Sequence, residues 1–188
     1  ETIRVLLFIS ASIVVFNFYP VTAVMIVLLA ILNDFPIMMI AYDNVPVARY
    51  PVRWNMHRVL IISTALGITG VISTFILFYV AKDYFYLSFS VIQTFIFLKL
   101  LVAGHFTIYV TRNTGSIWQR PWPNWRLFCT IELTQILGTL AAVYGWFVTP
   151  IGWSYALLIW GYALVWMFIG STVKLLLYKT VITRDHYQ

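Results

Sequence analysis

The chain has 188 residues, of which 62% are hydrophobic, 18% aromatic and only 10% charged. Soluble domains carry about 25% charged residues, so this composition, with a mean hydropathy of +0.88, excludes a soluble globular domain and indicates an integral membrane protein. The formal net charge is +6, yet the basic residues are scattered between apolar stretches, which excludes a nucleic-acid-binding patch.

Six apolar segments follow one another, most of them close to the roughly 20 residues that a membrane-spanning helix needs. They are residues 3–18, 21–41, 57–80, 89–110, 125–147 and 151–178. Tight turns at Tyr19-Pro20 and Thr149-Pro150 favour helical hairpins. The sequence therefore predicts an all-α polytopic membrane protein, with six transmembrane helices in three antiparallel hairpins and one membrane domain over residues 1–188.

The start of the chain has no feature of a targeting segment. It opens at Glu1 without a methionine and enters an apolar run almost at once. It has neither a basic region nor a small-residue cleavage motif before that run, so we do not expect a signal peptide. We expect the chain to be a piece of a longer protein.

Basic residues near the ends of the apolar segments predict the orientation in the membrane. Those expected on one side are Arg49, Arg53 and Arg58, then Arg112, Arg120 and Arg126, and in the tail Lys174, Lys179 and Arg184. The loops on the opposite side offer only Lys82. Because basic loops stay in the cytoplasm, both termini are predicted to be cytoplasmic.

The second predicted span holds the most informative residues, because Asp34 and Pro36 interrupt an otherwise apolar stretch. An ionisable side chain at bilayer depth costs about 2.5–3.5 kcal/mol on insertion scales, so it is usually kept where it pairs, binds an ion or carries a proton. Proline removes a backbone donor, so we expect this helix to be interrupted near Asp34 and Pro36, with freed carbonyls beside the acid. These features predict a transport site.

Arg4 on the first span can reach the same depth as Asp34. Arg4 lies about 15 residues before the Tyr19-Pro20 turn and Asp34 about 14 after it, so both lie roughly 21–23 Å from that turn. Two interpretations stay open. Arg4 is a built-in counter-ion that holds Asp34 ionised, or Arg4 extends to the cytoplasmic interface while Asp34 only joins helices by hydrogen bonds.

Lys99, His105 and Glu132 are further ionisable residues, in the fourth and fifth spans. Counted from the loop between these spans, His105 and Glu132 fall at a similar depth of about 9–10 Å, so we expect the two to bond. A hydrogen bond between His105 and Glu132 has two interpretations: a structural pair that stabilises a helix interface, or a proton relay. The sequence does not indicate a partner for Lys99.

Small residues predict where helices approach closely: Gly67 and Gly70 in the third span, and Gly138 and Ala142 in the fifth. The sequence contains no phosphate-binding loop, nucleophile triad or zinc motif. We therefore predict no catalytic residue, no metal site and no bound cofactor within this chain.

Short motifs along the chain follow one another in a recognisable order. They are Thr2-Ile3-Arg4, Ala30-Ile31-Leu32-Asn33-Asp34, Ile37-Met38, Asp43-Asn44-Val45, Ile108-Tyr109-Val110-Thr111-Arg112, Arg120-Pro121, Ala141-Ala142-Val143-Tyr144, Ile151-Gly152-Trp153 and Ile159-Trp160. In this order they resemble the fifth to tenth membrane helices of the plasma-membrane proton pumps among the P-type ATPases. At Phe35-Pro36 the chain departs from the plant and fungal pattern, where Gly-Thr is usual, and Pro36 resembles a proline of cation-pumping relatives.

The resemblance implies roles for three residues: Asp34 binds the transported proton, Arg4 is its counter-ion and Asn33 lies beside the acid. It implies the C-terminal half of the transport domain of an ATP-driven, proton-exporting pump of the plasma membrane. The lipid bilayer and the remaining helices and cytoplasmic domains of the pump would be its partners. The phosphorylation site and nucleotide site, with ATP and Mg²⁺, would belong to those domains, so this chain alone should hydrolyse nothing.

Two other classes of function stay open. One is a complete six-helix secondary transporter or channel built around Asp34 and Pro36, although the inverted repeats common in such proteins are not apparent. The other is a non-transporting membrane subunit whose charges only hold helices together. An Asp-Lys-Thr-Gly-Thr motif in the sequence upstream of Glu1 would decide for the pump.

Overall fold

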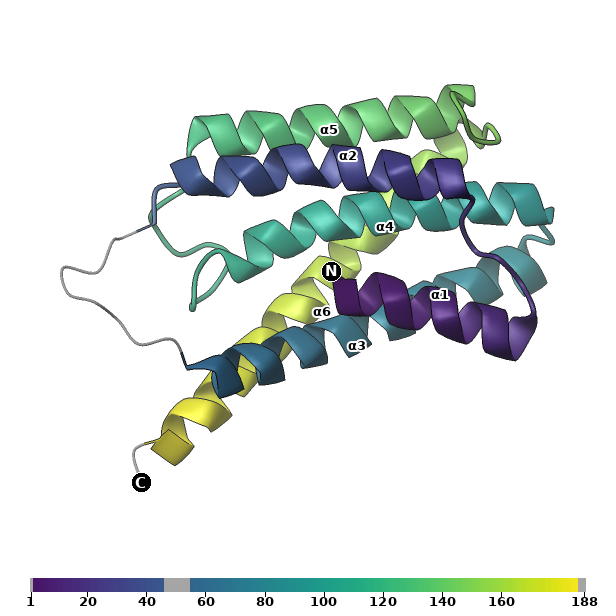
Figure 1. Cartoon of the computed structure of the whole chain (residues 1–188). Helices are drawn as coiled ribbons and strands as arrows, with labels where there is room; N and C mark the ends of the chain where they lie inside the picture. The colour runs from purple at the N-terminus through teal and green to yellow at the C-terminus, as the bar shows by residue number, and fades with distance from the viewer. Residues whose placement is uncertain (1, 46–54, 186–188) are drawn as a thin grey trace.

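The computed structural model describes residues 2–45 and 55–185, the last five by their backbone only, and this part of the chain forms six α-helices (Figure 1). They are α1 (Thr2–Phe16), α2 (Ala23–Met39), α3 (Met56–Tyr79), α4 (Phe89–Thr111), α5 (Trp125–Tyr144) and α6 (Gly152–Asp185). A 3₁₀ turn, η1 (Ile40–Tyr42), follows α2, and a π-helical turn, η2 (Val80–Tyr84), follows α3. The described residues contain no strand, so the predicted all-α class is confirmed.

Local sequence signals fix several helix ends. The side-chain oxygen of Thr22 accepts a hydrogen bond from the N–H of Met25 at 3.3 Å, which caps the start of α2. Asn124 caps α5 in a similar way, by accepting from the N–H of Arg126 at 3.0 Å. At the other end of α5, Gly145 adopts a φ of 82°, in the left-handed region that glycine enters without a steric cost.

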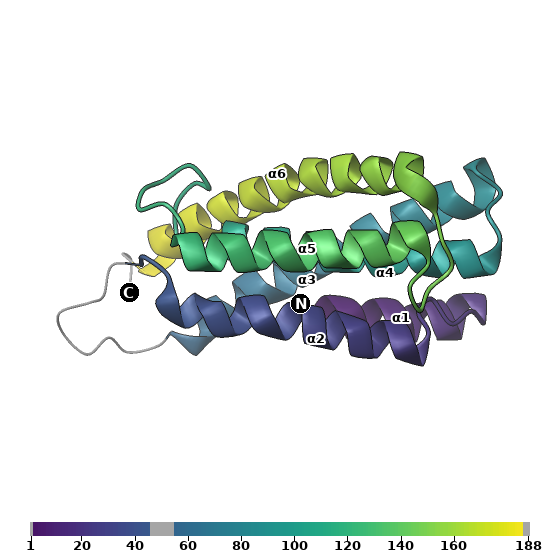
Figure 2. The same cartoon turned by 90° about the horizontal axis from the view of Figure 1, so that it is seen from above.

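The helix α4 is the centre of the bundle, and its residues 94–102 are all completely buried. On one side of it α2 packs against α5, and on the other α1 packs against α3 while α6 packs against both α3 and α4 (Figures 1 and 2). The principal partner of α1 is therefore α3, and that of α2 is α5, although a tight turn joins α1 to α2.

The predicted close packing at small residues is confirmed. A Cβ added to Gly138 on α5 would lie 2.0 Å from Cδ2 of Leu101 on α4, and one added to Gly67 on α3 would lie 3.0 Å from Cγ2 of Ile3 on α1. Ala142, one turn after Gly138, is completely buried. Small residues thus let helix backbones approach closely. In lipid this close packing matters because the hydrophobic effect does not drive helices together.

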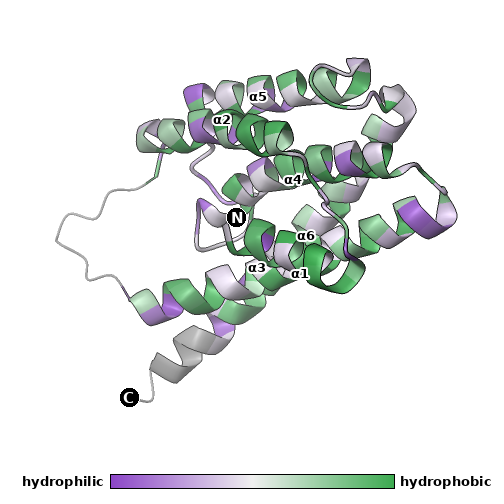
Figure 3. Ribbon diagram, turned by 45° about the vertical axis from the view of Figure 1, so that its right-hand side comes forward, coloured by the Kyte–Doolittle hydropathy of each residue, from purple (hydrophilic) through white to green (hydrophobic). Residues whose placement is uncertain are grey.

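Most residues of the helices are apolar (Figure 3), and many large apolar side chains are exposed along them. Within the described residues, five helices are long and apolar enough to cross a membrane. The sixth, α1, is also apolar but has only 15 residues. A helix satisfies its own backbone hydrogen bonds, which is what lipid requires of any spanning segment, so the prediction of a polytopic membrane protein is confirmed.

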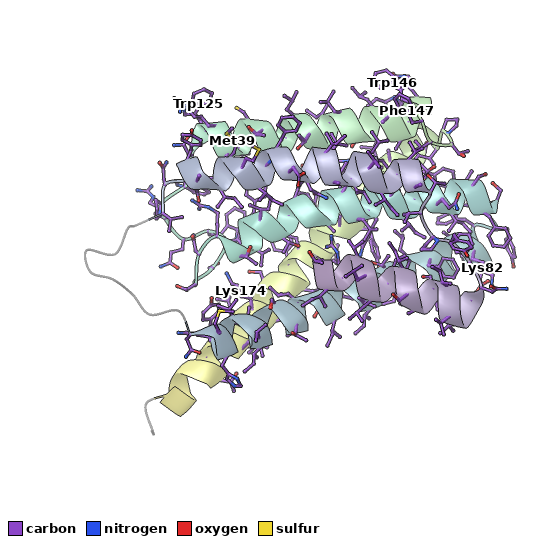
Figure 4. The ribbon with its side chains drawn as sticks, in the orientation of Figure 1. Met39, Lys82, Trp125, Trp146, Phe147 and Lys174 are labelled. Atoms are coloured by element: carbon purple, nitrogen blue, oxygen red, sulfur yellow. The ribbon has the colours of Figure 1, made fainter. Side chains whose placement is uncertain are left out.

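One end of the bundle gathers the end of α2, the start of α3, the end of α4, the start of α5 and the end of α6 (Figure 1). The segments predicted to be basic belong to this end, including Arg112 after α4, whereas Lys82 lies at the opposite end (Figure 4). Arg49, Arg53 and the side chain of Arg184 lie outside the described residues. Which end faces the cytoplasm stays a prediction.

The expected interruption near Asp34 and Pro36 requires a correction. The α-helix continues through Pro36 to Met39, and its geometry changes only at η1. Proline removes one backbone donor, which membrane helices tolerate when neighbouring helices satisfy the freed carbonyl. Pro36 is buried against such neighbours, so α2 keeps its helical bonds on either side of it.

Candidate functional site

The predicted ion-binding segment lies in the second half of α2. Asn33 is half-buried, whereas Asp34 is exposed between apolar neighbours such as Ile31 and Phe35, which are also exposed. The start of α2 is about 17 Å away at 1.5 Å per residue, which places the carboxylate well inside an apolar stretch. At that depth a carboxylate needs a partner, an ion or a proton.

Arg4 comes from α1 and is buried, with only 5% of its surface exposed. Its Nη2 donates a hydrogen bond to the carbonyl oxygen of Leu100 on α4 at 3.0 Å. The side chain reaches α4 by passing over Gly70 of α3, where an added Cβ would lie 2.3 Å from the Arg4 Cδ. Glycine at position 70 therefore leaves the space that the arginine occupies.

Arg4 and Asn33 line one cavity of about 260 Å³, enclosed by α1, α2, α3 and α4. Its other polar lining residues are Ser63, Thr107 and Thr111. The structure thus brings Arg4 and the predicted ion-binding segment to one cavity. Asp34 is the residue after Asn33 and does not line this cavity, so direct pairing of Arg4 with Asp34 stays a prediction.

Lys99 is completely buried on α4, and the structure identifies partners that the sequence did not indicate. Its Nζ donates to the carbonyl oxygen of Gly70 at 3.1 Å and to the hydroxyl of Thr74, both on α3. The Thr74 hydroxyl in turn donates to the same Gly70 carbonyl at 2.7 Å. Lys99 and Arg4 line a small cavity of about 50 Å³ next to Gly70.

His105 and Glu132 have different partners, in place of the predicted bond between them. Nε2 of His105 lies 3.3 Å from the carbonyl oxygen of Leu32 on α2, and the imidazole is completely buried. Glu132, half-buried on α5, accepts a hydrogen bond from the hydroxyl of Tyr109 at 3.1 Å. His105 therefore contacts the segment that carries Asn33 and Asp34, whereas the hydrogen bond of Glu132 is to Tyr109 on α4.

A polar cluster that sequence reasoning missed holds the end of α2 to its neighbours; we call it the Asp43 clasp, formed by Asp43, Arg112 and Asn124. Arg112 donates from Nε and Nη2 to the two carboxylate oxygens of Asp43, both at 3.0 Å. The N–H of Asn124 donates to the same carboxylate at 3.0 Å. The side chains of Arg112 and Asp43 are only 6% and 2% exposed, so this bidentate pair is buried.

Lys174 was also missed, because the sequence indicated only a basic residue near the tail. It is 1% exposed on α6 (Figure 4) and donates from Nζ to the carbonyl oxygens of Val110, Asn113 and Gly115, at 2.7, 3.0 and 2.5 Å. These carbonyls lie at and after the end of α4, where the last turn of a helix leaves acceptors without intrahelical partners. A cation is favourable at this negative end of the helix dipole.

Comparison with known proteins identifies relatives of the whole segment. No family model matches the chain. A protein of Methanocaldococcus jannaschii named as a cation-transporting ATPase is 50% identical over 179 residues, or 95% of this chain. Plasma membrane ATPase 2 of Schizosaccharomyces pombe and Plasma membrane ATPase 1 of Saccharomyces cerevisiae are 32% and 30% identical, each over 65% of this chain.

These relatives are much longer than the chain, which spans 22% of the length of the first and 13% and 14% of the other two. The alignment with the first relative covers 95% of the chain. The chain therefore corresponds to one part of proteins that are named as ATPases.

Proposed function

We propose that this chain, a homologue of P-type ATPases over 65–95% of its length, forms part of the membrane region of a proton-exporting pump. The observation that carries the proposal is the arrangement at α2. Asp34 follows Asn33 in an apolar helix, and Asn33 shares a cavity of about 260 Å³ with the buried Arg4. An acid and a fixed cation at one depth suit the binding and release of a proton.

The charge of the site favours a proton over a metal cation. Hard metal ions are bound by several oxygen ligands, commonly with more than one carboxylate. The cavity that Arg4 and Asn33 line has no acidic residue among its lining, and Arg4 contributes a positive charge to it. A single carboxylate, that of Asp34 next to Asn33, is enough to take up and release a proton.

Each residue then has a distinct task in the proposed pump. Asp34 takes a proton from the cytoplasmic side and releases it outside, and Asn33 supplies a neutral amide next to the carboxylate. The fixed charge of Arg4 favours the ionised carboxylate, which promotes release and opposes return of the proton. ATP and Mg²⁺ would act on cytoplasmic domains, in the part of the longer protein that this chain does not include.

The test is ATP-driven acidification by the full-length protein in sealed vesicles. Asp34→Asn should abolish proton transport while ATP-dependent phosphorylation persists, because the neutral amide mimics only the protonated acid. Asp83→Asn is the matched control: it makes the same chemical change at an exposed position in η2, and transport should be retained. Wild-type acidification by Asp34→Asn would refute the proposal. Transport by the wild type without ATP would instead favour a secondary transporter.

A further inference from the structure

Pro36 leaves one carbonyl of α2 without its usual helical donor. In an α-helix the N–H of each residue donates to the carbonyl four residues earlier, so residue 36 would donate to Leu32. Proline has no N–H, and yet the α-helix runs on to Met39. The carbonyl of Leu32 therefore has to find a donor elsewhere, since an unsatisfied polar group in lipid costs several kcal/mol.

The structure supplies a donor for this carbonyl from α4. His105 is completely buried, and its Nε2 lies 3.3 Å from the carbonyl oxygen of Leu32. A carbonyl oxygen only accepts, so Nε2 carries the hydrogen in this contact. The imidazole N–H thus takes the place of the backbone N–H that Pro36 lacks.

This contact lies next to the proposed ion site. Leu32 directly precedes Asn33 and Asp34 in α2, and α2 packs against α4. A bond to the Leu32 carbonyl fixes the rotation and height of the turn that carries both residues. The contact spans 73 positions of sequence, so local sequence does not produce it.

We propose that His105 is the positioning residue of the ion site: its Nε2–H replaces the missing N–H of Pro36 and holds the Asn33–Asp34 turn in place against α4. The expected effect of His105 on transport rests on the proposed function. Its structural part, the coupling between His105 and Pro36, is independent of which ion moves.

The experiment is a double-mutant cycle in the full-length protein. His105→Leu removes the donor and leaves the Leu32 carbonyl unsatisfied. We expect the apparent affinity for the transported proton to fall about tenfold, which is the size of change that results if the cost of one unsatisfied buried acceptor falls on the proton-binding state. Pro36→Ala restores a backbone N–H to the Leu32 carbonyl. In that background His105→Leu should cost less than about threefold, because coupled neighbours are non-additive.

A conservative variant separates hydrogen bonding from packing. His105→Gln keeps an N–H at a similar distance from the backbone and should stay within about threefold of the wild type. His57→Leu is the control, because His57 is exposed at the start of α3 and its loss should leave the affinity unchanged. If His105→Gln is as impaired as His105→Leu, or if His105→Leu costs the same in both Pro36 backgrounds, the inference is wrong.

A second readout distinguishes this inference from the proposed function. The modification rate of an Asn33→Cys variant by a small thiol reagent reports the position of the turn, whatever ion is transported. We expect His105→Leu to change that rate, and Pro36→Ala to remove most of the change. If this coupling is seen while Asp34→Asn still pumps protons, the positioning role stands and the proposed function fails. If the rate does not respond to His105, the positioning role is overturned.

Discussion

Asp43→Ala tests whether the Asp43 clasp holds the end of α2 in place. The substitution removes the carboxylate that accepts two hydrogen bonds from Arg112 and one from the N–H of Asn124, each at 3.0 Å. The Arg112 side chain, only 6% exposed, would then keep a buried charge without its counter-ion. Removing one partner of a buried ion pair costs about 3–5 kcal/mol.

The loss can be measured as the thermal unfolding midpoint of the purified protein in detergent. For a unit of 150–250 residues, 1 kcal/mol moves the midpoint by about 2–4 °C, so we expect a decrease of roughly 6–20 °C. Asp83→Ala, at an exposed position, should leave the midpoint unchanged. A decrease below about 3 °C for Asp43→Ala would show that the pair contributes no more than a solvent-screened surface pair.

Two further predictions concern packing and topology. Gly138→Ala should destabilise the bundle by about 1–3 kcal/mol, because its Cβ would lie 2.0 Å from an α4 side chain. Gly161→Ala is the control, since its Cβ would meet nothing within 4 Å, and it should not destabilise the bundle. Equal thermal unfolding midpoints for the two variants would contradict this reasoning. Cysteines placed at Asn44 and Asn113 should react with an impermeant reagent only from the cytoplasmic side, and one at Ser88 only from outside; labelling of Asn44 and Ser88 from the same face would overturn the orientation.

The helices themselves were predictable because lipid imposes a length and an internally bonded backbone on each of them. Apolar runs therefore located all six, and caps such as Thr22 and Asn124 adjusted their ends by a few residues. Packing partners were not predictable. In a soluble helix the polar face marks the outside. Here residues 94–102 of α4 are buried, whereas most residues exposed on α2 are apolar, so the pattern of polar residues does not show which face packs.

The charged residues were located correctly in the sequence but several of their contacts were not foreseen. Arg112 and Lys174 were interpreted as basic residues that set the orientation in the membrane, yet both are buried. Arg112 donates to the carboxylate of Asp43, and Lys174 donates to carbonyl oxygens at the end of α4. Counting basic residues near span ends does not separate an exposed cation from one that binds a helix terminus. The one signal available was Asp43 itself, an acid directly after a span and in a loop otherwise rich in arginine.

The two cations beside Gly70 indicate which helices are held together in the proposed pump. Arg4 on α1 passes over Gly70 to the carbonyl of Leu100, and Lys99 on α4 donates to the carbonyl of Gly70 itself. These contacts tie α1, α3 and α4 together through backbone atoms, which do not change their charge during a cycle. Asp34 belongs to α2, whose principal partner is α5. The contact of His105 on α4 with the Leu32 carbonyl also ties α2 to this group of helices. In the proposed pump, opening that contact would let α2 move relative to α4, which would change the distance from Asp34 to the fixed charge of Arg4 and with it the affinity of the carboxylate for a proton.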